Sequence, residues 1–141
     1  VPKVTPASAK KTFEALTNSI DEGVVRACHD LSEGGLATAA AEMAFGSNHG
    51  LEIYLKNVPR TEDVNRNDFV LFSESNSRFL VEVTLERKNR FDELMKDCVC
   101  AEIGAVTDKP LFDVYGLNEE KLLAVELAKL MERWKNALGG A

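Results

Sequence analysis

The segment HDLSEGGL, residues 29–36, combines polar side chains with two adjacent glycines. We expect a strand to end just before Ser32, with Ser32 capping a helix whose first turn holds Gly34 and Gly35. Each glycine in a helix is less favourable than alanine by about 1 kcal/mol, so we expect the two glycines to provide a benefit that offsets this destabilisation. Bare amides at the positive end of a helix dipole let a phosphate approach. Ser32, Gly34 and Gly35 are therefore candidate anion contacts. The alternative is close packing, with Glu33 satisfying the dipole.

The neighbouring side chains do not form a hydrolase triad, although His29, Asp30 and Ser32 have the required types. Adjacent residues of a strand project to opposite faces, and the members of a triad are brought together by the fold. Asp30 is retained as a candidate substrate or anion contact beside the turn.

A second polar segment, FSESNSRF at residues 72–79, joins two apolar stretches. Its hydroxyls, carboxylate and guanidinium suit a sugar-phosphate, which makes Glu74, Ser75 and Arg78 candidate contacts. The alternative is a self-bonded turn, in which serine and asparagine side chains satisfy nearby backbone amides. The residues taken alone favour that alternative.

Three cysteines, Cys28, Cys98 and Cys100, are an odd number and provide no disulfide framework. Cys98 and Cys100 would share one face of a strand, but the two histidines lie far away in sequence and zinc usually takes four ligands. We predict buried free thiols, no metal site and a reducing cytoplasm.

Composition narrows the function classes. The 141 residues suit one domain; 45% are hydrophobic, and the formal net charge is −6. This charge argues against a general binder of nucleic acid or membrane surfaces. No apolar run approaches the roughly 20 residues that span a bilayer, and the first residues lack the layout of a signal peptide.

Hydrophobic periodicity predicts an α+β fold. Without its terminal helices, the order is strand, helix, strand, strand, helix, strand. This ferredoxin-like order predicts a mainly antiparallel sheet packed with helices in a single domain, residues 1–141. The expected helices cover 6–20, stopped by Gly23, then 34–45 and 86–96, and a last helix begins at Asn118. The apolar stripe of that last helix consists of Leu123, Leu127, Leu130, Trp134 and Leu138. The expected strands cover 24–31, 51–55, 79–83 and 99–106, with a short apolar piece at 69–72 and an extended piece over 110–114.

Three motifs in order carry a family resemblance: HDLSEGGLA at 29–37, LFSESNSRF at 71–79 and IGAVTD at 103–108. Together they resemble the C-terminal domain of the synthetase subunit of phosphoribosylformylglycinamidine synthase, in the AIR synthase-related C-terminal domain family. The resemblance covers roughly residues 5–114. Related families carry looser versions of the first motif.

The resemblance implies a carbon–nitrogen ligase of de novo purine biosynthesis with glutamine as amide donor. ATP activates the formamide oxygen of formylglycinamide ribonucleotide, and ammonia from a glutaminase then displaces phosphate. ATP, magnesium and the catalytic histidine belong to N-terminal domains without a counterpart in this chain. The implied partners are these domains, a glutaminase subunit and a small accessory subunit, and we expect the isolated chain to be inactive.

The resemblance also bears on the candidate contacts. A Glu-Ser-Gln turn of the first of two duplicated C-type domains is expected to contact substrate, and Glu74, Ser75 and Asn76 stand at its positions. Asn76 departs from that pattern, and HDLSEGGLA is more similar to the second copy. A different hypothesis remains open: a free-standing anion- or nucleotide-binding domain, or an assembly domain, without catalysis.

Overall fold

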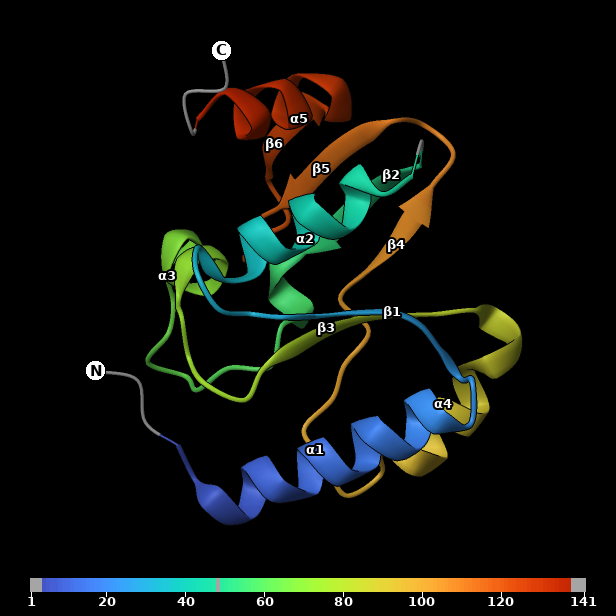
Figure 1. Ribbon diagram of the computed structural model, residues 1–141. Helices are drawn as coiled ribbons and strands as arrows, with labels where there is room; N and C mark the ends of the chain where they lie inside the picture. Colours follow the sequence, from blue (N-terminus) through green and yellow to red (C-terminus); the bar gives the residue numbers. More distant parts are fainter. Residues whose placement is uncertain (1–3, 48, 138–141) are drawn as a thin grey trace.

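A two-stranded ribbon and a four-stranded sheet form the β structure of the described residues (Figure 1). The computed structural model describes residues 4–47 and 49–137. Neighbouring strands are antiparallel except β2 and β5, which are parallel. The predicted α+β class with mainly antiparallel pairing is confirmed. The ribbon pairs β1 (Val25–Asp30) with β3 (Phe79–Val83), and the sheet has the order β4 (Gly104–Thr107), β2 (Gly50–Tyr54), β5 (Leu111–Tyr115), β6 (Lys121–Glu126).

The strands are divided between two sheets, whereas the ferredoxin-like order predicts one. Strand β2 explains the division, because β4 pairs with one of its edges and β5 with the other. Neither edge of β2 remains for the ribbon strands β1 and β3. The ribbon therefore lies apart from the four-stranded sheet, on the opposite side of α2 (Gly35–Phe45) (Figure 1).

The other helices are α1 (Pro6–Asp21), α3 (Asn67–Phe72), α4 (Lys88–Leu94) and α5 (Leu127–Asn136), with 3-10 turns at Leu55–Asn57 and Leu85–Arg87. Helix α1 begins with Pro6 and is followed by Gly23 at φ +66°, as the sequence predicts. It packs on α4 and the ribbon, whereas α5 packs on α2. In the part of the chain that the structure describes, no helix combines the length and apolar character that crossing a membrane requires.

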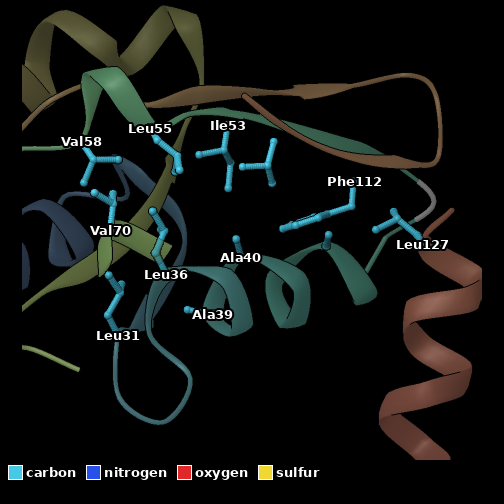
Figure 2. Packing of buried hydrophobic residues seen from close by; sticks show 12 residues of the cluster. Leu31, Leu36, Ala39, Ala40, Ile53, Leu55, Val58, Val70, Phe112 and Leu127 are labelled. Carbon is cyan, nitrogen blue, oxygen red and sulfur yellow. The ribbon is translucent and has the colours of Figure 1, made fainter. Parts of the chain in front are cut away.

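The main core lies between α2 and one face of the four-stranded sheet (Figure 2). Ala39 and Ala40 are small enough for the helix to lie close to the sheet, where Ile53 and Phe112 are buried. Strand β5 shows the alternation expected of a sheet with one covered face, since Phe112 and Val114 are buried and their neighbours are not. A smaller cluster of Val24, Phe91 and Met95 lies beneath the ribbon.

The C-terminal prediction is wrong in part, because residues 121–126 form strand β6 and the last helix begins at Leu127. A short apolar run is compatible with a helix or with a strand. Residues 121–126 form a strand because they pair with the free edge of β5. Trp134, predicted to be core, is 51% exposed; its ring contacts Phe45, and its Nε1 donates to Glu42 at 3.0 Å. Leu138 of the predicted stripe lies outside the described residues.

Two shorter stretches also differ from the prediction. The strand expected from Val99 begins only at Gly104, and Val99 is 83% exposed. Gly104 marks where the chain reaches β2, because a Cβ there would overlap the carbonyl of Glu52. The apolar piece at 69–72 belongs to helix α3.

Candidate functional site

The two polar segments singled out in the sequence lie against each other. Pairing of β1 with β3 places Asp30 opposite Phe79, so segments 29–36 and 72–79 leave the ribbon at the same end. The N–H of Leu31 continues this pairing by donating to the carbonyl of Arg78 at 3.0 Å. The structure therefore brings both sets of candidate contacts to one place.

The turn before α2 is built on two left-handed glycines, Gly34 at φ +75° and Gly35 at φ +61°. Gly34 is the N-cap residue, so the prediction that Ser32 caps the helix is wrong. Ser32 is exposed and instead accepts a 3.3 Å hydrogen bond from the N–H of Gly35 through its carbonyl. The left-handed pair thus forms a turn that links Ser32 to α2.

Gly35 packs tightly against the end of α3. An added Cβ would lie 2.8 Å from the carbonyl oxygen of Ser73 and 2.9 Å from that of Leu71. Ordinary Cβ contacts are longer, so a side chain here would push α3 away. The packing interpretation of the glycine pair therefore holds for Gly35, which is buried.

The amide of Gly34 already has an anionic partner. Its N–H donates to Oε1 of Glu74 at 2.9 Å, which places a carboxylate at the positive end of the α2 dipole. This is the role that the sequence suggested for a phosphate or for Glu33. Thr38, which the sequence did not single out, completes the turn, because a Cβ on Gly34 would overlap its hydroxyl. The i, i+4 spacing is the signal that could have found it.

Arg78 turns back onto its own loop. Its Nη1 donates to the carbonyl of Ser73 at 3.3 Å and to Oγ of Ser73 at 3.1 Å, and that Oγ lies 3.3 Å from Oγ of Ser75. Burial lowers the pKa of the Arg78 guanidinium from its ordinary value. These contacts match the self-bonded turn, while Glu74 and Ser75 remain exposed.

His29 and Asp30 differ in their roles. His29 points toward α2, with its Nε2 at 3.0 Å from Oε2 of Glu42 and its Nδ1 at 2.7 Å from the carbonyl of Asp30. Nε2 therefore serves the contact between β1 and α2, whereas the Nδ1 contact is local to β1. The side chain of Asp30 is exposed beside the turn.

The family model "AIR synthase related protein, C-terminal domain" matches residues 1–116. The chain belongs to this family. The AIR synthase-related C-terminal domain thus accounts for both polar segments, the ribbon and β2, β4 and β5 of the four-stranded sheet.

Relatives of this AIR synthase-related domain are much longer proteins. The phosphoribosylformylglycinamidine synthase subunit PurL of Lactobacillus helveticus is 37% identical over 123 residues, which are 87% of this chain and 15% of that protein. The structure of T. maritima PurL complexed with FGAR has a TM-score of 0.81 and 25% identity, and covers 92% of this chain and 22% of that one. The structure of T. maritima PurL complexed with ATP has a TM-score of 0.77 and 25% identity, and the match covers 86% of this chain and 21% of that one. The chain thus spans less than a quarter of each relative.

The cysteines of the domain are free, as predicted, but the prediction that they are buried is wrong for Cys28 and Cys100, which are exposed. Cys28 lies on the outer face of the ribbon, where residues alternate with those that point inward. Cys100 lies in the irregular segment that precedes β4, where no strand pairing covers it.

Proposed function

We propose that this chain is the C-terminal lobe of an ATP-dependent ligase that converts formylglycinamide ribonucleotide into the amidine with glutamine-derived ammonia. The family membership and the relatives named PurL support this function, as do the structures of T. maritima PurL with FGAR and with ATP. The observation that carries the proposal is the family match over residues 1–116, which includes both polar segments of the site. We assign the protein to the cytoplasm, where purine precursors are made.

In this proposal, the reaction requires both this lobe and further domains of a longer subunit. Residues 4–47 and 49–137 contain no group of three His, Cys, Asp or Glu side chains that could hold a metal ion. Magnesium and ATP are therefore assigned to the ATP-binding domains that the family resemblance implies. A glutaminase subunit and a small accessory subunit are the other proposed partners, and the 141 residues alone should show no turnover.

Within this lobe, the exposed groups of the site are proposed to contact the ribonucleotide. Glu74 and Ser75 offer a carboxylate and a hydroxyl to substrate hydroxyl groups, and Gly34 holds Glu74 in place through its amide. The turn of Ser32, Gly34 and Gly35, with Asp30 and Arg78 beside it, is proposed to border the bound ribonucleotide.

The test measures ADP formation that depends on formylglycinamide ribonucleotide, with ATP, magnesium and ammonia, by the polypeptide of the complete reading frame. We expect turnover, and a loss of about tenfold or more in kcat/KM for the ribonucleotide in Glu74→Ala, because substrate would lose a charge-assisted hydrogen bond. Replacement of Glu62, an acidic residue of a different surface loop, is the control. The proposal fails if the purified polypeptide forms ADP at the same rate without the ribonucleotide.

A second candidate is an assembly domain without catalysis. It is favoured by one finding, that Gly34 and Gly35 are already engaged by Glu74 and by the end of α3. On this hypothesis Glu74→Ala lowers the free energy of unfolding but leaves kcat/KM unchanged. The same variant therefore separates the two functions.

A further inference from the structure

Three side chains of the loop between α3 and β3 (Figure 1) form a hydrogen-bonded row. Ser77, at φ +62°, lies in the turn that brings Arg78, directly before β3, beside Ser73, directly after α3. Nη1 of Arg78 donates to Oγ of Ser73 at 3.1 Å, and that Oγ lies 3.3 Å from Oγ of Ser75. The row thus runs from a half-buried cation to an exposed hydroxyl.

The backbone of Ser73 is held as well as its side chain. Its N–H donates to the carbonyl of Phe69 at 3.2 Å, and its carbonyl accepts a second bond from Nη1 of Arg78 at 3.3 Å. Gly35 approaches the same carbonyl so closely that a Cβ would not fit between them. Ser73 therefore has little freedom to move. It is half-buried, whereas Ser75 is exposed, so Ser75 is the hydroxyl that a ligand can reach.

The hydrogen-bonding capacity of each group gives the row a direction. A guanidinium donates hydrogen bonds and never accepts them, so Oγ of Ser73 accepts from Arg78. The hydroxyl proton of Ser73 remains, and Oγ of Ser75 is the acceptor that the described part of the chain places within its reach. A cationic donor also polarises the hydroxyl that it binds, which makes that hydroxyl a stronger donor in turn. Ser73 therefore donates to Ser75.

The proton of Ser75 is then left to point away from the row. Within residues 4–47 and 49–137, Oγ of Ser75 has no hydrogen-bond partner besides Ser73. The adjacent Glu74 uses Oε1 for the amide of Gly34, while its Oε2 has no partner among the same residues. The exposed surface of the loop thus presents a donor and an acceptor on neighbouring residues.

A hydroxyl group matches this pair, because it donates to a carboxylate oxygen and accepts from a serine. A phosphate offers acceptors alone, and the charge of Glu74 repels it. We infer that Ser73, held by Arg78, is a positioning residue that orients Ser75 as a hydrogen-bond donor to a sugar hydroxyl of the ribonucleotide. This inference rests on the proposed function and specifies which part of the substrate the loop recognises.

The test measures KM and kcat separately for the polypeptide of the complete reading frame. Ser73→Ala should raise KM for formylglycinamide ribonucleotide about threefold to tenfold, with kcat and the KM for ATP unchanged, because Ser75 loses the orientation of one hydrogen bond. Ser73→Thr keeps a hydroxyl and should behave as the parent does. The double variant Ser73→Ala/Ser75→Ala should be no weaker than Ser75→Ala alone, because Ser73 acts through Ser75. Ser47→Ala is the matched control, since it removes a hydroxyl that binds the amide of His49 beyond the other end of α2.

A second measurement does not depend on turnover. In the isotope-labelled chain of 141 residues, the couplings between the Hα and Hβ protons of Ser75 report its side-chain rotamer. We expect a single rotamer in the parent and in Ser73→Thr. Ser73→Ala and Arg78→Gln should both give averaged couplings, because either substitution interrupts the row.

Several outcomes would overturn the inference. Averaged couplings of Ser75 in the parent would show that the row does not hold its side chain. An unchanged KM in Ser73→Ala, or losses that add in the double variant, would show that Ser73 does not act through Ser75. A parent that forms no ADP in response to the ribonucleotide would instead refute the proposed function, and with it the assignment to a sugar hydroxyl. If Ser73→Ala fails to fold, the couplings of Ser75 in Arg78→Gln remain decisive.

Discussion

The backbone amide of Gly34 donates a 2.9 Å hydrogen bond to Oε1 of Glu74, a residue 40 positions further along the chain. This bond joins the start of α2 to the loop between α3 and β3. It gives the α2 dipole a carboxylate from the chain itself, at the place where a bound phosphate would lie. The two sequence motifs are thus parts of one local structure.

Removal of Glu74 should expose the Gly34 amide to external anions. In Glu74→Ala, we expect inorganic phosphate to shift the amide resonances of Gly34 and Gly35 at concentrations that leave the parent unchanged. The reason is that the competing carboxylate has gone, which frees the amide of Gly34, while the amide of Gly35 next to it keeps its bond to Ser32 and senses the bound anion.

Ser75→Ala is the control for this experiment, because it alters the same loop without freeing the amide. Identical phosphate responses in the parent and in Glu74→Ala would show that the turn is not an anion site. A bulky residue at Gly35 would not test the anion site, because it would collide with the end of α3.

Gly35→Ala should destabilise the chain far more than Gly23→Ala. Both glycines have positive φ, which costs an alanine about 1–2 kcal/mol. A Cβ on Gly23 would meet nothing within 4 Å, whereas one on Gly35 would lie under 3.0 Å from backbone atoms of 71–73. Overpacking adds about 1–3 kcal/mol at Gly35. Urea unfolding measures both, and equal losses would contradict the packing role of Gly35.

Acid should remove the contribution of the ion pair between Glu22 and Arg90. The guanidinium of Arg90 donates two hydrogen bonds of 2.8 Å to the Glu22 carboxylate. These bonds are the main reason that the pKa of Glu22 lies below its ordinary value of 4.5. A lowered folded-state pKa stabilises the chain above pH 4.5, and this contribution is lost as the pH falls through the folded value.

Urea midpoints of the parent and of Glu22→Gln, measured from neutral pH downward, test this prediction. We expect the parent to be the more stable at neutral pH and the difference to close in acid. In an Arg90→Gln background, the Glu22 substitution should have little effect at any pH. A difference that is the same at pH 3 and pH 7 would contradict the prediction.

Local signals in the sequence predicted the beginnings and ends of several elements correctly. Pro6 and Gly23 act through their own backbone preferences, so their effect on α1 does not depend on distant residues. The two candidate segments were also located by residue type alone. Their contact was not foreseen, since it depends on the register in which β1 pairs with β3.

The features that sequence reasoning missed are settled by partners far along the chain. Residues 121–126 have an apolar run that suits a helix or a strand, and only the free edge of β5 selects the strand. Likewise, β5 pairs with β2 in parallel across more than fifty residues, which excludes a single ferredoxin-like sheet. A local sequence pattern does not determine which sheet edge a strand pairs with.

Cys28 should react slowly with iodoacetamide at pH 8 although the residue is exposed. Partial burial of the thiol, and then the negative charge of Asp30, raise the pKa of Cys28 above its ordinary value. The reactive thiolate is therefore scarcer than in the unfolded chain. Mass spectrometry of peptides alkylated for short times gives the rate at each cysteine. Asp30→Asn should speed alkylation of Cys28 while Cys100, whose pKa is also raised by burial, keeps its rate. If Cys28 reacts as fast in the folded parent as in urea, its surroundings do not control the thiol.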